Sequence, residues 1–452
     1  MSDRQHFHFG QALLPDGWAS DVAILVRQGV VVSVEAGVVA RGDADRHAIA
    51  LPGLPNLHSH AFQRAMAGLA EVNLGGDDNF WSWRETMYRF VRRLTPDHLR
   101  AIAAMAYAEM LETGFTRVGE FHYLHHDRDG RPFADPAAMS LAVFEAASET
   151  GIALTHLPVF YAHSGFGGAA PGEGQRRFLH DGDGFAALLD RLRPVVAALP
   201  DAVLGVAPHS LRAVTPEELA VVATLGDGPV HIHIAEQVKE VEDCLAWSGA
   251  RPVQWLLDHA DVDARWCLVH ATHMTEDEAG RFAHSGAVAG LCPITEGNLG
   301  DGIFPAAPYL AAGGAYGVGS DSNVLIDASE ELRLLEYGQR LCDRRRSRMA
   351  VAGASVGDTL YRAALAGGAR ALGAPASLAV GNPADFVSLD PDHPSLAARQ
   401  GGLLTDGWVF AAGRQAIDGV WRRGRRLVTA GRHVDRARIA ARYRRALGEL
   451  LA

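Results

Sequence analysis

The feature that most constrains this chain is a regular alternation of apolar and amphipathic segments from Leu51 onward. Eight short runs rich in Val, Ile, Leu and Ala have the composition of buried strands, and stretches rich in Ala, Leu, Arg and Glu, typical of helices, separate them. The runs cover residues 54–60, 115–122, 152–160, 202–210, 228–236, 265–273, 287–293 and 315–323. Alternating strands and helices favour a parallel sheet, and eight such units predict a closed (β/α)8 barrel of the TIM type.

Polar side chains mark the ends of these runs. Nearly every run closes on His, Glu, Asp, Ser or Tyr. In a barrel of this kind the C-terminal ends of the strands open into the loops that build the active site. The sequence therefore predicts a site at that face, assembled from several strand ends.

Segments outside the barrel predict a smaller second unit. Residues 21–40 are rich in β-branched side chains, and residues 377–390 and 416–431 again have the composition of strands. The tail from Asp435 is rich in Arg and Ala, which favours a closing surface helix with a solvated charged face. We expect the small β domain to comprise residues 1–50 and 376–452, and the barrel to comprise residues 51–375.

Composition excludes several function classes. A formal net charge of −11, with no basic tract interleaved with aromatic residues, argues against nucleic-acid binding. No stretch approaches the roughly 18 apolar residues that a membrane span needs, and the first residues lack the apolar core of a signal peptide. We therefore expect a cytoplasmic protein with neither a nucleic-acid nor a membrane partner.

Cysteine and lysine usage narrows the chemistry further. The four cysteines, Cys244, Cys267, Cys292 and Cys342, include no C-x-x-C pair, so we expect reduced packing residues. Among 42 basic residues only Lys239 is a lysine. A P-loop, a pyridoxal enzyme and a lysine-bridged two-metal barrel each need a lysine of their own, and Lys239 lies just past the fifth predicted strand.

Three H-x-H pairs are candidate metal ligands. They are His6/His8, His58/His60 and His231/His233. Residues two apart on a strand point to the same side, so His58 and His60 can converge on one ion at the end of the apolar run LPGLPNL. The first pair lies in a terminus without a strand pattern. In the third pair His233 is favoured as a ligand, because Glu236 follows it at the strand exit, and His231 is interpreted as a hydrogen-bonded core residue.

Later strand ends complete a possible zinc site. Asp321 closes the run AYGVGSD and is the natural carboxylate ligand, with a helix N-cap as its alternative. His270 can orient or deprotonate a metal-bound water, or serve as a fourth histidine ligand or a structural residue. Glu236 is the candidate proton shuttle. Three histidines and one carboxylate match a catalytic zinc ion, and the absence of a bridging lysine favours one ion per chain.

Longer motifs carry a family resemblance. LPGLPNLHSHAFQRAMAGLAE, FTRVGEFHYLHH, APHSLRAV, HIHIAEQVKEVEDC, RWCLVHATHM, CPITEGNLGDGIFP and GVGSDSNV together resemble the amidohydrolase superfamily, and within it the formimidoylglutamate deiminases. The resemblance runs from about Leu51 to Asn323. It implies a TIM-like barrel with a small β-sandwich domain formed by both chain ends. It also implies zinc-dependent deimination of N-formimino-L-glutamate to N-formyl-L-glutamate and ammonia, a step of histidine degradation.

The resemblance also implies residue roles. His58, His60, His233 and Asp321 would hold one zinc ion, Glu236, His270 and Asp321 would handle protons, and Gln63, Arg84, Tyr123, His209, Arg212 and Ser322 would contact the substrate. A small substrate with two carboxylates needs forked, permanently charged donors in a chain of charge −11, and Arg84 and Arg212 fit that need, with a surface position as the alternative for each. Ile294 stands where we expect threonine.

Three other functions stay open at this point. A related deaminase would act on a heterocycle such as guanine or an adenosine derivative, in a pocket that stacks aromatic rings on the substrate. A two-metal cyclic-amide hydrolase would need a carboxylate or cysteine bridge. A barrel without catalysis would serve as a binding scaffold. Barrels of this kind are commonly homodimers, which we expect here.

Overall fold

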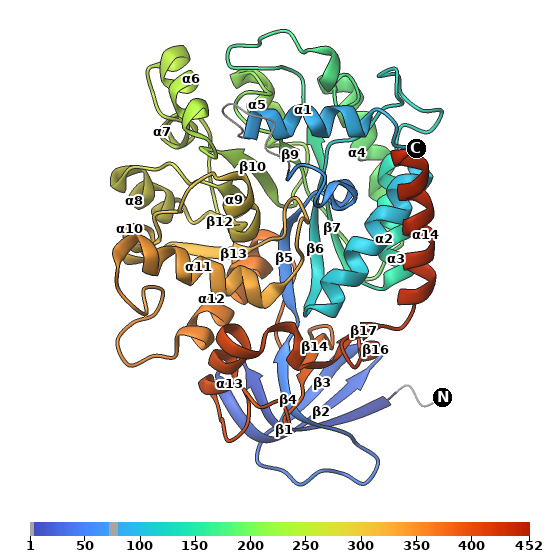
Figure 1. The fold of residues 1–452 in the computed structure, drawn as a ribbon, viewed down its shortest axis with the longest axis vertical. Helices are drawn as coiled ribbons and strands as arrows, with labels where there is room; N and C mark the ends of the chain where they lie inside the picture. The colour runs from blue at the N-terminus through green and yellow to red at the C-terminus, as the bar shows by residue number, and fades with distance from the viewer. Residues whose placement is uncertain (1–3, 72–79) are drawn as a thin grey trace.

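The protein is described by a computed structural model that covers residues 4–71 and 80–452. Figure 1 shows two parts: a barrel with its helices, and below it a sheet in which blue N-terminal strands lie beside red C-terminal segments. Hydrogen bonding between β4 (Asp45–Pro52) and β14 (Phe386–Leu389) joins the two chain ends within this sheet. The division of the chain at residues 50 and 375 stays a prediction.

The barrel consists of two sheets of parallel strands, and each of these half-sheets supplies four of the eight strand positions. They are β5 (Leu54–Ser59), β6 (Phe115–His122), β7 (Ala153–Phe160) and β8 (Val203–Leu204) with β9 (Ala207–Pro208), then β10 (Val230–Ile234), β11 (Trp266–His270), β12 (Val288–Leu291) and β13 (Ala315–Val318). Isolated parallel bridges close the ring, Ser59 to Asp321 on one seam and Val206 to Val230 and Ser210 to His233 on the other. The predicted eight-unit barrel is confirmed.

Helices cover the outside of the barrel. They are α2 (Pro96–Glu112), α3 (Ala138–Thr150), α4 (Gly182–Ala197), α5 (Pro216–Val222), α6 (Val238–Ser248), α7 (Pro252–His259), α8 (Glu276–Ser285), α9 (Pro293–Leu299), α10 (Ala306–Ala311), α11 (Ala328–Asp343) and α12 (Val356–Ala371). Local sequence fixes several of their starts. The hydroxyls of Thr215 and Thr275 each accept a hydrogen bond from the amide of the glutamate three residues on, and the carboxylate of that glutamate accepts one from the threonine amide. No helix within the described ranges is long and apolar enough to cross a membrane.

Both chain ends build the small β domain as one eight-stranded sheet. Its strand order is β17-β16-β15-β14-β4-β1-β2-β3. The remaining bounds are β1 (Arg4–Leu14), β2 (Gly17–Arg27), β3 (Val30–Glu35), β15 (Ile417–Arg422), β16 (Arg425–Thr429) and β17 (Arg432–His433). Aromatic rings form part of its core: Phe386 lies 5.1 Å from Phe9 and stacks on Trp421 at 4.6 Å between centroids. Burial of these rings joins segments from opposite ends of the chain.

Two sequence-based expectations were wrong, one in the small β domain and one on a barrel helix. The first residues, predicted to lack a strand pattern, form the 11-residue strand β1, in which His8 bonds the Val38 carbonyl. Its apolar positions are Phe7, Phe9, Ala12, Leu13 and Leu14 rather than the β-branched residues that identified β2. Cys342 is exposed on α11 and is not a packing residue, whereas the other three cysteines are buried.

The C-terminal helix α14 (Arg436–Leu451) packs along the barrel beside α2, as Figure 1 shows at the right. Its buried face consists of Ile439, Ala446 and Leu450. Arg436 also donates to Glu112 at 2.9 Å and to Glu109 at 3.1 Å. The expected helix is confirmed, and part of its charged face is paired with α2 instead of being wholly solvated.

Candidate active site

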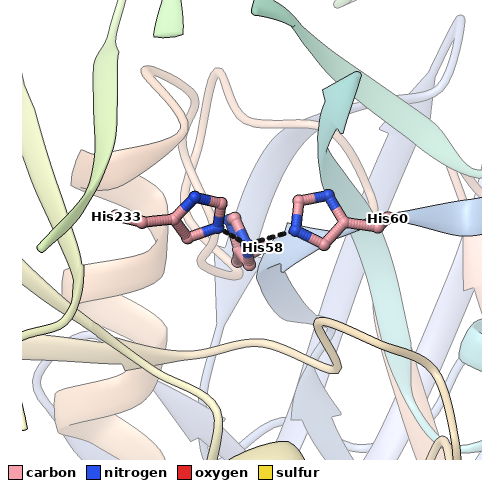
Figure 2. Close-up of side chains that lie close together, drawn as sticks. All are labelled: His58, His60 and His233. Carbon is pink, nitrogen blue, oxygen red and sulfur yellow. Dashed lines mark hydrogen bonds between the residues drawn. The ribbon is translucent and has the colours of Figure 1, made fainter. Parts of the chain in front are cut away.

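Three histidine rings converge at the C-terminal end of the barrel strands. The Nε2 atom of His58 lies 3.2 Å from Nε2 of His60 and 3.0 Å from Nε2 of His233. Figure 2 shows the His58 ring between the rings of His60 and His233; His60 directly follows β5, and His233 lies on β10. These rings are at most 5% exposed. The predicted convergence of the H-x-H pair with His233 is present in the structure.

Hydrogen bonds fix which ring nitrogens carry a lone pair. Nδ1 of His60 bonds the Phe121 carbonyl at 2.9 Å, and Nδ1 of His233 bonds the His209 carbonyl at 3.1 Å. A carbonyl only accepts, so each Nδ1 donates and each Nε2 of the neutral ring is left with a lone pair. Burial lowers the pKa of both rings, and it lowers that of His58 to about 3. The cluster therefore presents lone pairs toward a common point, which suits a cation.

Asp321 adds a carboxylate to this cluster. Its Oδ1 lies 3.3 Å from Nε2 of His60 and 3.6 Å from Nε2 of His58, whereas its Oδ2 faces His270 at 3.7 Å. Burial alone raises the pKa of Asp321, but the neighbouring histidines outweigh it and hold that pKa well below its usual range. The helix N-cap alternative does not apply, because Asp327 caps the following helix. Nitrogen and carboxylate donors in this number fit a catalytic zinc ion.

The strand ends that carry these side chains adopt left-handed backbone conformations. Ala235 follows β10 with φ of 50°, His270 ends β11 with φ of 67°, and Asp321 follows β13 with φ of 41°. Such values cost on the order of 1 kcal/mol each for residues other than glycine. Glu240 accepts hydrogen bonds from the amides of Ala235 and Glu236 at 3.1 and 3.2 Å, which stabilises one of these turns.

Two proton-transfer candidates lie beside the ligand cluster. Nε2 of His270 is 3.8 Å from Oε1 of Glu236, and its Nδ1 is 3.3 Å from Oε1 of Glu296. Burial raises the pKa of Glu236 to about 7, because the charged carboxylate loses hydration. Burial lowers the pKa of His270, but Glu236, Glu296 and Asp321 outweigh that effect and raise it to about 10. Both groups can therefore exchange protons with a bound molecule.

A cavity of about 570 Å³, open mouth included, lies over this cluster. It is lined by His60, His233, Glu236, His270 and Asp321, and by all the predicted substrate contacts: Gln63, Arg84, Tyr123, His209, Arg212 and Ser322. Three of these contacts already have hydrogen-bond partners, since Gln63 Nε2 donates to the Tyr123 hydroxyl at 2.8 Å and Ser322 Oγ lies 2.9 Å from Thr295 Oγ1. The structure thus places the predicted site residues together; His58 does not line the cavity but contacts His60, which does.

The two arginines enter the cavity from different elements. Arg84 lies on α1 (Phe80–Val91), and Arg212 follows β9. The Nε atom of each is buried and has no hydrogen-bond partner within the described part of the chain. Both guanidinium groups lie over the Trp81 ring, at 4.5 and 5.7 Å from its centroid. The alternative interpretation, in which each arginine lies on the protein surface, therefore does not apply.

Ile294 lies beside this cavity without lining it. Its amide donates to Glu331 Oε2 at 2.9 Å, a bond that any residue other than proline would make. The next residue, Thr295, lines the cavity instead. The departure from the expected threonine therefore falls on a side chain away from the substrate positions.

Sequence reasoning missed several buried residues that support the site. Glu296 contacts His270, and Glu120 accepts the Ala61 amide at 2.7 Å directly after the H-x-H pair. The Asn323 amide donates to the Ser59 hydroxyl and to the carbonyls of His60 and Asp321, which ties β5 to the end of β13. A signal existed for Glu296 and Asn323, since both lie inside motifs quoted for the resemblance. Glu120 also lies inside a quoted motif, FTRVGEFHYLHH, but nothing in that motif points to the amide that its carboxylate accepts.

Family models match nearly the whole chain. The model of the amidohydrolase family matches residues 49–427. Residues 5–48 match the model described as formimidoylglutamate deiminase HutF, N-terminal domain. The two matches together span both parts of the fold.

Individual relatives agree with these models. The chain is 54% identical to a formimidoylglutamate deiminase of Pseudomonas aeruginosa, over 98% of each chain, and 28% identical to an 8-oxoguanine deaminase of the same organism, over 91% and 89%. A crystal structure of an amidohydrolase from Brucella melitensis superposes with a TM-score of 0.97 at 55% identity, over 99% of this chain and 100% of that one. An adenosine deaminase from Xanthomonas campestris with bound zinc superposes with a TM-score of 0.80 at 25% identity, over 99% and 98%.

Proposed function

Because the chain belongs to the amidohydrolase family, we propose how the site described above carries out the deimination of N-formimino-L-glutamate. The reaction hydrolyses the C=N bond of the formimino group and yields N-formyl-L-glutamate and ammonia, a step of histidine degradation. One observation carries the proposal: histidine lone pairs and a carboxylate line the same cavity as two arginines, whose buried Nε atoms have no hydrogen-bond partner among residues 4–71 and 80–452. That arrangement suits a dianionic substrate with one polar carbon to be attacked.

His58, His60, His233 and Asp321 would hold one zinc ion per chain, since their donor atoms already converge. When bound, zinc supplies a Lewis acid that lowers the pKa of a coordinated water to about 7. A zinc ion held there would also offset the negative charge of Asp321, which is one of the carboxylates that raise the pKa of His270. His270 is then better able to accept a proton near neutral pH.

The proton steps fall to three side chains. His270, oriented by Glu296, and Asp321 would take the proton of the attacking water, since both line the cavity. Glu236 would deliver protons to the departing nitrogen. Its pKa of about 7 lets it hold a proton and release it at neutral pH. Ammonia then leaves as a neutral molecule or as ammonium.

The remaining lining residues would orient the substrate. Arg84 and Arg212 would each meet one carboxylate, because forked guanidinium groups match carboxylate oxygens in pairs. Gln63, Tyr123, His209 and Ser322 offer polar atoms between the arginines and the ligand cluster. They would hold the formimino group above the metal position.

Substrate comparison tests the assignment directly. Purified enzyme should release ammonia from N-formimino-L-glutamate and not from guanine or 5′-methylthioadenosine. Activity on a heterocycle alone would instead favour a heterocycle deaminase, the class to which the 28% identical 8-oxoguanine deaminase belongs. Metal analysis should give one zinc per chain; two ions at rest would favour a two-metal hydrolase, and none would favour a scaffold.

Glu236→Gln tests the proton shuttle. The substitution removes the acidic proton but keeps the size of the side chain, so zinc content should be unchanged. Turnover should fall by roughly 10²- to 10⁴-fold, the usual contribution of a positioned acid or base. Normal turnover with normal zinc content would remove Glu236 from this role.

We also propose that the enzyme acts in the cytoplasm as a homodimer. Four cysteines without a C-x-x-C pair suit a reducing compartment, and barrels of this size commonly pair. Light scattering of the purified protein checks the dimer. A mass of one chain, 48.3 kDa, would contradict it.

A further inference from the structure

A second group of ligand-type side chains lies beside the proposed zinc position. His270 ends β11, Cys292 follows β12 and Asp321 follows β13, and these three strands are neighbours in the half-sheet. One ligand atom from each of the three lies within 4.8 Å of the other two. All three residues are buried, with Cys292 wholly so and Asp321 5% exposed. We propose that His270, Cys292 and Asp321 form a second, inhibitory site for a borderline-soft divalent cation.

Donor chemistry selects the class of ion. The group combines an imidazole nitrogen, a thiol sulfur and a carboxylate oxygen, a set that suits Zn²⁺ or Cd²⁺ and not Mg²⁺ or Ca²⁺. Glu236 offers a fourth donor atom, since its Oε1 lies 3.8 Å from Nε2 of His270. Because His270, Asp321 and Glu236 line the cavity, an ion can reach the site from the side that the substrate uses.

The second site is distinct from the first although both use Asp321. Oδ1 of Asp321 faces His58 and His60, whereas Oδ2 faces His270. One carboxylate can therefore serve both positions, one oxygen to each. Charge also favours a second cation, because Glu236 and Glu296 both lie within 4 Å of His270 and Glu296 accepts the Cys292 amide at 2.9 Å.

Occupation of this site would stop turnover. The inference rests on the proposed function, in which His270, Asp321 and Glu236 move protons. An ion bound to these groups takes their lone pairs, so they cannot accept a proton from water or return one to the leaving nitrogen. Zinc would then be required at one position and inhibitory at a neighbouring one.

Cadmium absorption tests the site without using activity. The first ligand set contains no sulfur, so a thiolate-to-cadmium charge-transfer band in the zinc-loaded enzyme reports a cysteine-containing site. The exposed Cys342 is first replaced by serine to remove its own binding. We expect a band that saturates at one Cd²⁺ per chain, with turnover lost over the same concentrations and the first zinc retained on metal analysis.

Cys292→Ala and a matched variant complete the experiment. Cys292→Ala should abolish the band and raise the half-inhibiting Cd²⁺ and Zn²⁺ concentrations by about tenfold or more, the least expected when a metal site is damaged. Cys244→Ala, which removes a buried thiol on α6, should change neither. If Cys292→Ala fails to fold, Cys292→Ser keeps the side-chain size and should also lose the band.

Two outcomes would overturn the proposal. One is absence of a band up to millimolar Cd²⁺, and the other is a band or inhibition that Cys292→Ala leaves unchanged. A band that depends on Cys292 in an enzyme inactive on N-formimino-L-glutamate would instead retain the cation site and refute the proposed substrate. The experiment therefore distinguishes failure of the second cation site from failure of the proposed substrate.

Discussion

At the residue scale, the two cavity arginines carry the substrate assignment. Arg84→Met and Arg212→Met should each raise the KM for N-formimino-L-glutamate by about 10- to 100-fold, because a hydrogen bond to a charged group contributes roughly 1.5–3 kcal/mol. The turnover number should change less, since neither group touches the reacting carbon. Arg89→Met on the same helix is the control, because that side chain is exposed and contacts only Thr86 among the described residues. Unchanged KM in both cavity variants would contradict the assignment.

His231 makes a different prediction, about pH. The ring is buried, bonds the Ala371 carbonyl at 2.7 Å, and has its pKa lowered by burial from 6.5 to about 4. Because the unfolded chain binds the proton more tightly, stability is complete above pH 6.5 and is lost as pH falls toward 4. His231→Gln removes this loss while keeping a donor.

The measurement is the free energy of unfolding of both proteins between pH 7 and 4.5. Wild type should lose roughly 2 kcal/mol relative to His231→Gln over that range. Both proteins lose bound metal alike as the pH falls, so the difference between their free energies of unfolding reports the titration of the His231 ring alone. A difference independent of pH would show that His231 titrates normally in the folded protein.

Single residues also show where sequence reasoning works and where it stops. His58, His60, His233 and Asp321 were predictable because each closes an apolar run, and a barrel brings all such ends to one face. Glu120 and Glu240 were not, since each is defined by the backbone amides that it accepts. Those amides point toward the carboxylates only in turns that form when the chain folds.

At the scale of elements, the C-terminal helix gives the clearest test. Ile439 is fully buried where α14 meets the barrel helices. Ile439→Ala should lower the free energy of unfolding by about 2–4 kcal/mol, the usual effect of deleting buried methyl groups. Arg445→Ala, at an exposed position of the same helix, should stay within about 0.5 kcal/mol. Equal effects of the two changes, measured by denaturant unfolding, would mean that the helix does not dock as described.

Elements differed in how well pattern alone identified them. The eight barrel strands were predictable because buried parallel strands are continuous apolar runs. Strand β1 was not, since none of its residues is β-branched and its sequence includes the polar His6, His8 and Gln11; its pairing with β2 and β4 is what defines it. The fourth barrel position is split into β8 and β9 around Gly205 and Val206, a break that the run of residues 202–210 does not reveal.

At the scale of the molecule, the proposed ligand set takes residues from both half-sheets. His58 and His60 belong to the half that begins with β5, whereas His233 and Asp321 belong to the half that spans β10 to β13. An ion bound to all four stabilises the closed barrel over any open form. At a metal concentration 1,000 times the Kd this contributes about 4 kcal/mol.

Chelation should therefore lower the unfolding temperature of the whole protein by several degrees, as measured by scanning calorimetry. Re-addition of zinc should restore it. His58→Ala should unfold at one temperature with or without chelator, because the set is already incomplete. A chelator-insensitive wild type would show that the ion does not link the halves.

The seams of the barrel also bear on how the protein is made. His233 is synthesised 175 residues after His58, and Asp321 later still, so a growing chain presents an incomplete ligand set until the last barrel strand has left the ribosome. The bridge between Ser59 and Asp321 closes the ring at that same point. A chain that ends before residue 321 would lack the carboxylate of the proposed ligand set, so we expect it to bind the ion more weakly than the complete barrel does.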